Sequence, residues 1–368
     1  MKHKFKSALF ILPILLGTSF LNAETKTTEG TKKSFQFPSY SEQSYDEVDA
    51  VSYELPYQET GFHLTGQFLY WQTLEANMVY GLDQSGRANG DDAVSLLGHL
   101  KQNAYRWDPG VRAGGGYCFS AETIDANLEY TYFHNEGGDS TGLREGRVLK
   151  SIFPIVTNPF FGPIVSMNTK SDLQYHTLDL YATHMFQGSH SFVMKFLAGV
   201  RGAWISEGAN SYYKTNYLLI PFLERVVKTT VQNTWKFSGA GLRAGLSMDW
   251  FMFWGLSLHT EANLSAIVGR FRAKQQIDET TGYRVAKTFP SDTRMIPSLQ
   301  LVMGFAWRKV FGSLGLKVFA NWELNMWDDL SQTYMYPTAA ADDIALVGSW
   351  VRNSVNIQGI TAGFAAEF

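Results

Sequence analysis

Hydrophobic and polar residues alternate with a period of two along most of the chain beyond its first sixty residues. In the stretch 255–271, Leu258 and Leu264 fall on one face, while His259 and Glu261 fall on the other. Neighbouring side chains of an extended strand point to opposite faces, so each such stretch has one apolar and one polar side. The pattern predicts β-strands that separate an apolar from an aqueous environment.

The predicted strands are long, evenly distributed and joined by connections of alternating length. Ten can be placed: 62–74, 105–119, 123–134, 171–186, 191–206, 233–250, 255–271, 294–308, 313–327 and 354–368. Short connections fall near 120–122, 187–190, 251–254 and 309–312; long ones fall near 75–104, 135–170, 207–232, 272–293 and 328–353. Short periplasmic turns and long extracellular loops are typical of transmembrane barrels. We therefore predict an all-β fold, an antiparallel up-and-down transmembrane barrel of about ten strands, or twelve if a long loop hides a hairpin.

Aromatic residues support this fold because they gather near both ends of the strands. The group beside the short turns is Tyr117, Phe119, Phe186, Phe192, Trp250, Phe251, Phe253, Trp254, Trp307 and Phe311. The group near the opposite ends is Tyr70, Trp71, Tyr105, Trp107, Tyr132, Trp204, Trp235, Trp322 and Trp327. Amphipathic rings settle at the headgroup level, so two belts are expected. The alternative, a soluble β-sandwich, would bury its aromatic residues in the middle of the strands.

The two chain ends carry export and assembly signals. Residues 1–23 combine a positively charged start, a short apolar stretch and a small residue at Ala23, as in a cleaved signal peptide. Residues 24–60 are polar and predict a periplasmic lead-in, with the barrel at 61–368. The last strand alternates to Phe364 and Phe368, which resembles the signal read by the β-barrel assembly machinery. These features predict an outer-membrane location, with membrane lipid and that machinery as partners.

Composition narrows the possible functions. The 368 residues carry a formal charge of −3, and removal of three lysines with the signal takes it to −6, which argues against a nucleic-acid partner. Cys118 is the only cysteine, so neither an intramolecular disulfide nor a cysteine-based metal cluster is possible. Walker, Rossmann and GxSxG patterns are missing.

Several short segments resemble a known family. They are Phe68-Leu69-Tyr70-Trp71, Trp107-Asp108-Pro109-Gly110-Val111-Arg112, Leu197-Ala198-Gly199-Val200-Arg201-Gly202-Ala203-Trp204-Ile205, Gly241-Leu242-Arg243-Ala244-Gly245-Leu246 and Gln358-Gly359-Ile360-Thr361-Ala362-Gly363. Their order is similar to that in the Legionella-type pore-forming outer-membrane proteins, also described as major-outer-membrane-protein-like porins of environmental chlamydiae. The resemblance covers about 62–368 and implies a major surface protein that forms a diffusion pore. It implies neither catalytic residues nor a cofactor, and the single cysteine departs from the cysteine-rich classical chlamydial porins.

The polar face of the strands is the predicted functional site. The lumen-lining candidates are Arg112, Asp125, Glu129, Asp179, Lys195, Arg201, Arg243, His259, Glu261, Lys317 and Glu323. Arg112 should lie across from Glu129, and Arg243 near Glu261, with each pair stabilising the sheet by roughly 0.2–1 kcal/mol. Such pairs could line a pore with weak ion preference, or they could plug a narrow barrel. The two interpretations are equally favoured. The best functional expectation is passive diffusion of small hydrophilic solutes or ions, with no enzymatic activity. The alternative is a structural or adhesive surface barrel. Either protein could form a homo-oligomer.

Other candidate sites are weaker. The apolar part of loop 135–170 could constrict the lumen or, as we expect, pack at the outer lip. His259 with Glu261 offers only two metal ligands, and His176, His184 and His190 lack a metal-binding spacing. An outer-membrane protease could use acidic rim residues with a histidine; the candidates are Asp91-Asp92, Asp328-Asp329, Asp342-Asp343, His99 and His134. Acidic loop residues are usually solvated, and no metal or catalytic site is predicted.

Overall fold

A computed structural model describes most of the predicted barrel. The described residues are 60–75, 78–85, 98–119, 124–153, 161–189, 191–218, 224–280, 284–335 and 349–368. They all belong to the unit Val51–Phe368, one of two into which the chain divides. The predicted signal peptide and all but the last residue of the predicted lead-in lie outside the described residues. None of the described segments forms a helix long and apolar enough to cross a membrane.

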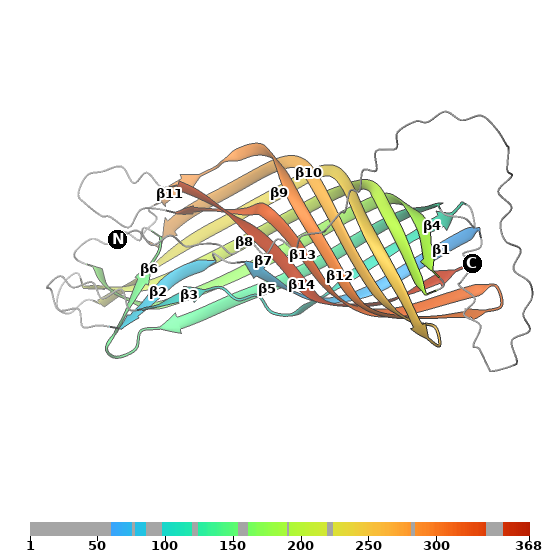
Figure 1. Cartoon of the computed structure of the whole chain (residues 1–368). Helices are drawn as coiled ribbons and strands as arrows, with labels where there is room; N and C mark the ends of the chain where they lie inside the picture. Colours follow the sequence, from blue (N-terminus) through green and yellow to red (C-terminus); the bar gives the residue numbers. More distant parts are fainter. Residues whose placement is uncertain are drawn as a thin grey trace, which may run out of the picture. The chain divides into compact units, whose positions relative to one another are not determined.

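Ten strands form a closed ring in which each is antiparallel to both neighbours (Figure 1). The ring consists of β1 (Gly61–Glu75), β4 (Asp108–Cys118), β5 (Ile124–Gly142), β7 (Phe161–Ser189), β8 (Phe192–Leu218), β9 (Glu224–Phe253), β10 (Leu256–Glu279), β12 (Ser291–Phe311), β13 (Leu314–Met335) and β14 (Ser349–Glu367). It closes where β14 pairs with β1, with His63 opposite Glu367. The predicted fold class and strand count are confirmed. Closure gives every strand two hydrogen-bonded neighbours, as a backbone in lipid requires.

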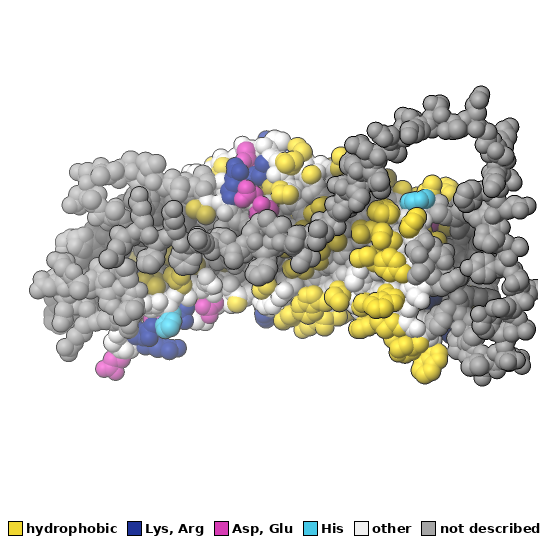
Figure 2. Space-filling view, viewed as in Figure 1, with side chains coloured by type: hydrophobic (Ala, Val, Ile, Leu, Met, Phe, Trp, Pro, Cys, Tyr) yellow, Lys and Arg dark blue, Asp and Glu magenta, His cyan; other side chains and the backbone are white. Residues whose placement is uncertain are grey.

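The outer surface of the wall is apolar over one part of its length. Leu242, Leu264 and Phe364 have 72%, 65% and 52% of their surface exposed, which no water-soluble sheet would tolerate across a continuous band. On the face shown in Figure 2, the apolar side chains gather over the half of the wall that contains the short turns, and charged side chains lie over the other half. The apolar half is the part that lipid would surround.

Two belts of exposed aromatic residues border this apolar band. Beside the short turns, Trp250 and Trp254 are 57% and 75% exposed; near the opposite border, Trp204 and Trp322 are 48% and 46% exposed. We call these the periplasmic belt and the outer belt. Four residues assigned to the outer belt from the sequence do not belong to it: Trp71, Tyr105, Trp235 and Trp327 are 0–4% exposed and pack inside the barrel. Position within the alternation, rather than distance from the strand end, decides which face a ring occupies.

The strands run much further outward than predicted. The short connections after Phe253 and Phe311 match the prediction, while 120–122 and part of 187–190 lie outside the described residues. Most of the long connections are themselves strand: β7, β8 and β9 contain 29, 27 and 30 residues. A tilted strand needs only about 9–11 residues to cross the membrane. The prediction ended each strand where its outward face ceased to be apolar, whereas backbone pairing continues into water with polar residues on that face.

The connections also contain four short strands. β2 (Val79–Ser85), β3 (Gly98–Gln102) and β6 (Arg147–Ser151) form a separate three-stranded sheet, and β11 (Arg284–Thr288) pairs with the outer end of β10. In Figure 1 these elements lie at the end opposite the C-terminus. None of them enters the ring, so the alternative of twelve membrane strands is wrong for the described residues.

The described parts of the loop 135–170 pack against inward-facing side chains at the outer end of the barrel, while 154–160, part of the apolar stretch expected at the lip, lie outside the described residues. Phe153 and Ile164 of the loop form a buried cluster with Tyr213, Val231 and Ile277, which point inward from β8, β9 and β10. Other members of this cluster are Tyr80, Leu149 and Met167. Inward-facing apolar side chains so far from the lipid band need an apolar partner, and the loop supplies it.

Hydrogen bonds fix the small sheet at this end of the barrel. The Tyr213 hydroxyl donates to the Tyr80 carbonyl at 2.6 Å, and the Tyr80 hydroxyl donates to Asp139 at 2.8 Å. Burial and the Asp139 carboxylate raise the pKa of Tyr80, so its hydroxyl remains a donor at any physiological pH.

Candidate functional site

The inner face of the barrel holds all eleven lumen candidates, and the structure divides them into two groups. Seven form a charged layer at the level of the apolar band: Arg112, Glu129, Asp179, Arg201, Arg243, Glu261 and Glu323. The other four surround a cavity nearer the short turns: Asp125, Lys195, His259 and Lys317. Alternation along each strand placed them on this face, whereas the grouping follows from strand register.

Arg112 organises one side of the charged layer. Its NH1 and NH2 donate to the two carboxylate oxygens of Glu323 at 3.0 and 2.7 Å, and its Nε lies 3.5 Å from Glu129. The predicted Arg112–Glu129 contact is therefore present, but the closer partner comes from β13, across the lumen. A two-point arginine–carboxylate contact fixes both side chains in orientation as well as in distance.

Asp179 organises the other side. It accepts hydrogen bonds from Nε and NH2 of Arg201 at 2.6 and 2.9 Å. NH1 of Arg243 lies 2.6 Å from the same carboxylate, in an ion pair without hydrogen-bond geometry, and its NH2 lies 3.5 Å from Glu261, the partner predicted for it. Asp179, Arg201 and Arg243 are only 1–3% exposed. Burial makes these contacts strong, and makes the loss of any one partner costly.

Gln300 joins the two sides and was missed in the sequence. Its Oε1 accepts from Arg201 and Arg243 at 3.1 and 2.9 Å, and its Nε2 donates to Glu323 at 2.6 Å. An uncharged residue attracts little notice in a search for charge, but its position in the alternation of β12 places it on the inner face. The three arginines and four carboxylates of the layer leave one net negative charge.

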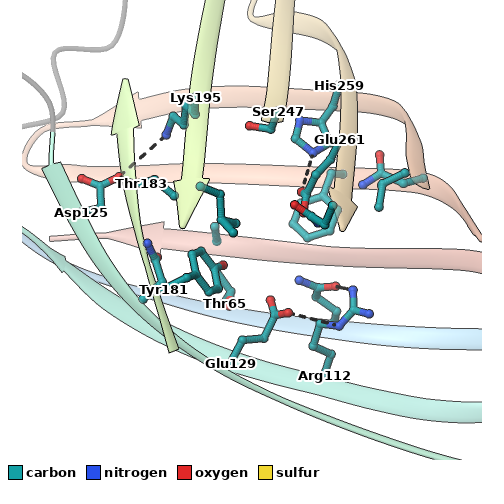
Figure 3. Close-up of a pocket in the computed structure, with 18 of the residues that line it drawn as sticks. Thr65, Arg112, Asp125, Glu129, Tyr181, Thr183, Lys195, Ser247, His259 and Glu261 are labelled. Atoms are coloured by element: carbon teal, nitrogen blue, oxygen red, sulfur yellow. Dashed lines mark hydrogen bonds and ion pairs between the residues drawn. The ribbon is translucent and has the colours of Figure 1, made fainter. Parts of the chain in front are cut away.

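A cavity of about 230 Å³ lies between the charged layer and the short turns; we call it the vestibule (Figure 3). Lys195 lies 4.0 Å from Asp125, and Lys317 lies 3.6 Å from Asp249, which also contacts His259 Nδ1 at 2.8 Å. The lysines are 28% and 25% exposed, so water reaches this region. Asp249 was not predicted from the sequence, although it shares the inner-face alternation of Arg243 along β9.

A closely packed, mainly apolar layer lies on the outer side of the charged layer, and it also holds the buried carboxylate of Glu207, which accepts from Trp235 Nε1 at 2.5 Å. Its side chains are 0–5% exposed: Leu69, Trp71, Tyr105, Phe133, Leu173, Tyr175, Ala203, Ile205, Trp235, Phe237, Ile267, Phe271, Ala273, Ile296, Trp327, Leu330, Val355 and Ile357. Side chains that line a water-filled channel are exposed to it, and these are not. At this level the barrel interior is filled by packed side chains.

Trp71 connects the apolar layer to the charged one. Its ring packs against Phe133 with centroids 5.5 Å apart, and the Arg112 guanidinium lies 5.3 Å from its centre. Its Nε1 donates to Thr361, whose hydroxyl donates to Glu323 at 3.0 Å. Movement of Trp71 would therefore disturb both layers.

The weaker candidates gain no support from their surroundings. Within the described residues there is no group of three or more potential metal ligands. Of the rim residues suggested for a protease, His134 contacts Glu136 at 3.6 Å and Asp328 accepts a hydrogen bond from Ser354 at 2.6 Å. Among the contacts of the described residues, none joins His134 to Asp328. His190, Asp91-Asp92 and Asp342-Asp343 lie outside the described residues.

A family model described as the Legionella pneumophila major outer membrane protein matches residues 54–364. The chain belongs to this family. The predicted resemblance is confirmed, and the family places the barrel in the outer membrane. A search of curated proteins finds no match.

Solved structures similar to this family member are also outer-membrane proteins. The outer-membrane protease OmpT of Escherichia coli is 8% identical, with a TM-score of 0.38, over 84% of this chain and 97% of that one. The toluene transporter TodX of Pseudomonas putida is 9% identical, with a TM-score of 0.24, over 83% and 89%. These likenesses are too distant to bear on activity.

Proposed function

We propose that this outer-membrane protein passes small hydrophilic solutes or ions through its lumen, and that the state described here is closed. The supporting observation is the charged layer reached from a water-accessible vestibule. Ionisable residues at the level of a lipid band are costly, and a functional pathway is the usual reason for them. Replacing buried ion pairs by apolar residues often leaves a protein as stable or more so. Stability alone therefore does not account for seven charged side chains in one layer. The passage needs no cofactor and no catalytic step.

The apolar layer determines how often such a passage would open. Removing a buried Trp or Phe from a packed interior costs about 3–5 kcal/mol. If opening displaces two rings, the cost is about 6–10 kcal/mol, and the open fraction is roughly 10⁻⁴ to 10⁻⁷. We expect rare, brief openings rather than the steady current of a wide porin. The charged layer, with its net negative charge, would give a weak preference for cations.

Conductance across planar bilayers tests the proposal. The refolded mature chain should show rare, discrete steps. The variant Trp71→Ala/Trp327→Ala removes two rings that are 0% and 1% exposed, and should raise the open probability at least 100-fold. The matched control, Trp204→Ala/Trp322→Ala, removes two rings of the outer belt and should leave conductance unchanged. Folding of each variant is checked by its shift on an unheated gel.

A second candidate is a surface scaffold that conducts nothing. The strands continue far beyond the apolar band, and the cluster around Phe153 and Tyr213 packs inside the outer end of the barrel. Both features suit a rigid support for extracellular structure. A folded barrel that stays silent in the wild type and in the Trp71→Ala/Trp327→Ala variant would favour the scaffold and exclude the pore.

A further inference from the structure

The outer surface of the barrel combines a row of basic residues on β9 and β10 with an apolar groove that extends over β9, β10, β12, β13 and β14. Arg270 and Arg272 of β10 and Lys236 of β9 are exposed to the outside. Arg272 and Lys236 are register partners, and Arg270 lies two residues nearer the membrane. Neighbouring strands are about 4.8 Å apart, and alternate residues of one strand are about 6.6 Å apart. The three cationic groups are therefore close enough to contact the same ligand. We call them the basic cluster.

The basic cluster lies at the outer border of the lipid band. Trp204 of the outer belt pairs with Ser238, and Ser238 pairs with Arg270. Val268, on the same face and two residues closer to the short turns, is 55% exposed, as a lipid-facing side chain would be. The headgroups of the outer leaflet occupy this level of a membrane protein.

No described acidic side chain neutralises the basic cluster. The row through Arg272 continues to Ser206 on one side and Ser291 on the other, while Arg270 is flanked by Ser238 and Thr293. Hydroxyl groups can donate to an anion without competing for the cations. Elsewhere on the wall, exposed arginines have acidic partners: Arg106 lies 3.6 Å from Glu136, and Arg352 lies 3.6 Å from Asp292.

An apolar groove of about 560 Å³ lies on the membrane side of the basic cluster, and the exposed Val268 separates the two along β10. Its apolar lining consists of Leu242, Ala244, Leu264, Ala266, Pro297, Leu299 and Met326; Asp328, Ser354 and Asn356 line it at the end away from the basic cluster. Ala266 lies opposite Leu242 on one neighbouring strand and Pro297 on the other, so small side chains form the floor between larger ones. From Ala266 to Arg270 the distance along the strand is about 13 Å.

We infer that this surface binds a phosphorylated lipid of the outer leaflet, with the acyl chain in the groove and the phosphate on the basic cluster. Arginine and lysine bind phosphate through charge-assisted hydrogen bonds, and Arg270 and Arg272 offer several donors each. A free anion would not need the groove, and an uncharged lipid would not need three unneutralised cations. The inference is independent of whether the lumen conducts.

Lipid binding to the full mature protein tests this inference. The protein is refolded in zwitterionic detergent, and the dissociation constant of diphosphoryl lipid A is measured by native mass spectrometry. The variant Arg270→Gln/Arg272→Gln should weaken binding about 30-fold, equivalent to about 2 kcal/mol for two cations. The control Lys214→Gln/Lys228→Gln removes two exposed cations that pair in register further from the membrane, and should change binding less than 3-fold.

A second pair of variants tests the groove. Ala266→Phe fills its floor and should weaken binding at least 5-fold, whereas Ala262→Phe, four residues closer to the short turns on the same lipid-facing side, should not. All four positions changed in β10 point away from the packed interior, so these variants should fold. Equal losses in a variant and its control would overturn the inference. So would displacement of the lipid by an equal concentration of inorganic phosphate, which would indicate a site for free anions.

Discussion

Asp179 provides the sharpest test of the buried charged layer. The substitution Asp179→Asn keeps the shape of the side chain but removes its charge, and leaves Arg201 and Arg243 close together without their shared partner. Asp179 is 1% exposed, accepts two hydrogen bonds from Arg201 and contacts Arg243 at 2.6 Å. Leaving a buried charge without its partner costs about 3–5 kcal/mol. We expect the free energy of unfolding to fall by about 3 kcal/mol, since the asparagine oxygen can still accept one hydrogen bond.

The measurement is urea unfolding of the refolded barrel in lipid vesicles, followed by tryptophan fluorescence. Asp125→Asn is the control: Asp125 is also buried, at 6% exposure, but its ionic partner Lys195 lies 4.0 Å away and is 28% exposed. The asparagine can keep the hydrogen bond from Thr183, and the lysine remains solvated, so a loss below about 1 kcal/mol is expected there. Adding Arg243→Gln to Asp179→Asn restores the charge balance and should return part of the lost stability. If Asp179→Asn costs no more than Asp125→Asn, water fills the charged layer, and its side chains are not buried as described.

Three further predictions concern the ends of the barrel. Phe368→Ala should lower assembly in cells several-fold. It should change the free energy of unfolding of the refolded barrel by less than about 1 kcal/mol, because the Phe368 side chain is 63% exposed. The control Phe311→Ala, at a side chain that is 51% exposed, should leave assembly intact. Gly255→Ala should destabilise the barrel more than Gly312→Ala. Both glycines have a positive φ, 78° and 62°, so both substitutions strain the backbone. Only the new Cβ at position 255 would also meet a backbone oxygen, at 2.3 Å. Equal losses in urea unfolding would contradict this. Cys118, at 2% exposure, should react with a maleimide only after unfolding, and labelling of the native barrel would refute its burial.

Much of the architecture follows from the alternation of side chains along the chain. A membrane strand must be apolar on one side. Leu264 and Leu242 therefore indicate the face toward lipid, and Glu261 and Arg243 indicate the face toward the lumen. The same argument places ten strands and four short turns, since the pattern breaks where the chain leaves the membrane. Beyond the membrane that signal ends, because water permits polar residues on the outer face. This is why the outward extensions of β7, β8 and β9 were assigned to loops.

The sequence by itself determined which side chains enter the lumen, because the two faces of a strand are fixed by a period of two. Only the tertiary structure decided which of them meet. Register and barrel closure bring Arg112 of β4 to Glu323 of β13, 211 residues away, and gather Trp71 and Trp327 into one packed layer. A contact across the lumen depends on the register of every strand between the two residues. A local sequence pattern therefore cannot predict it. The same register sets Lys236 beside Arg272 above the groove on the outer wall.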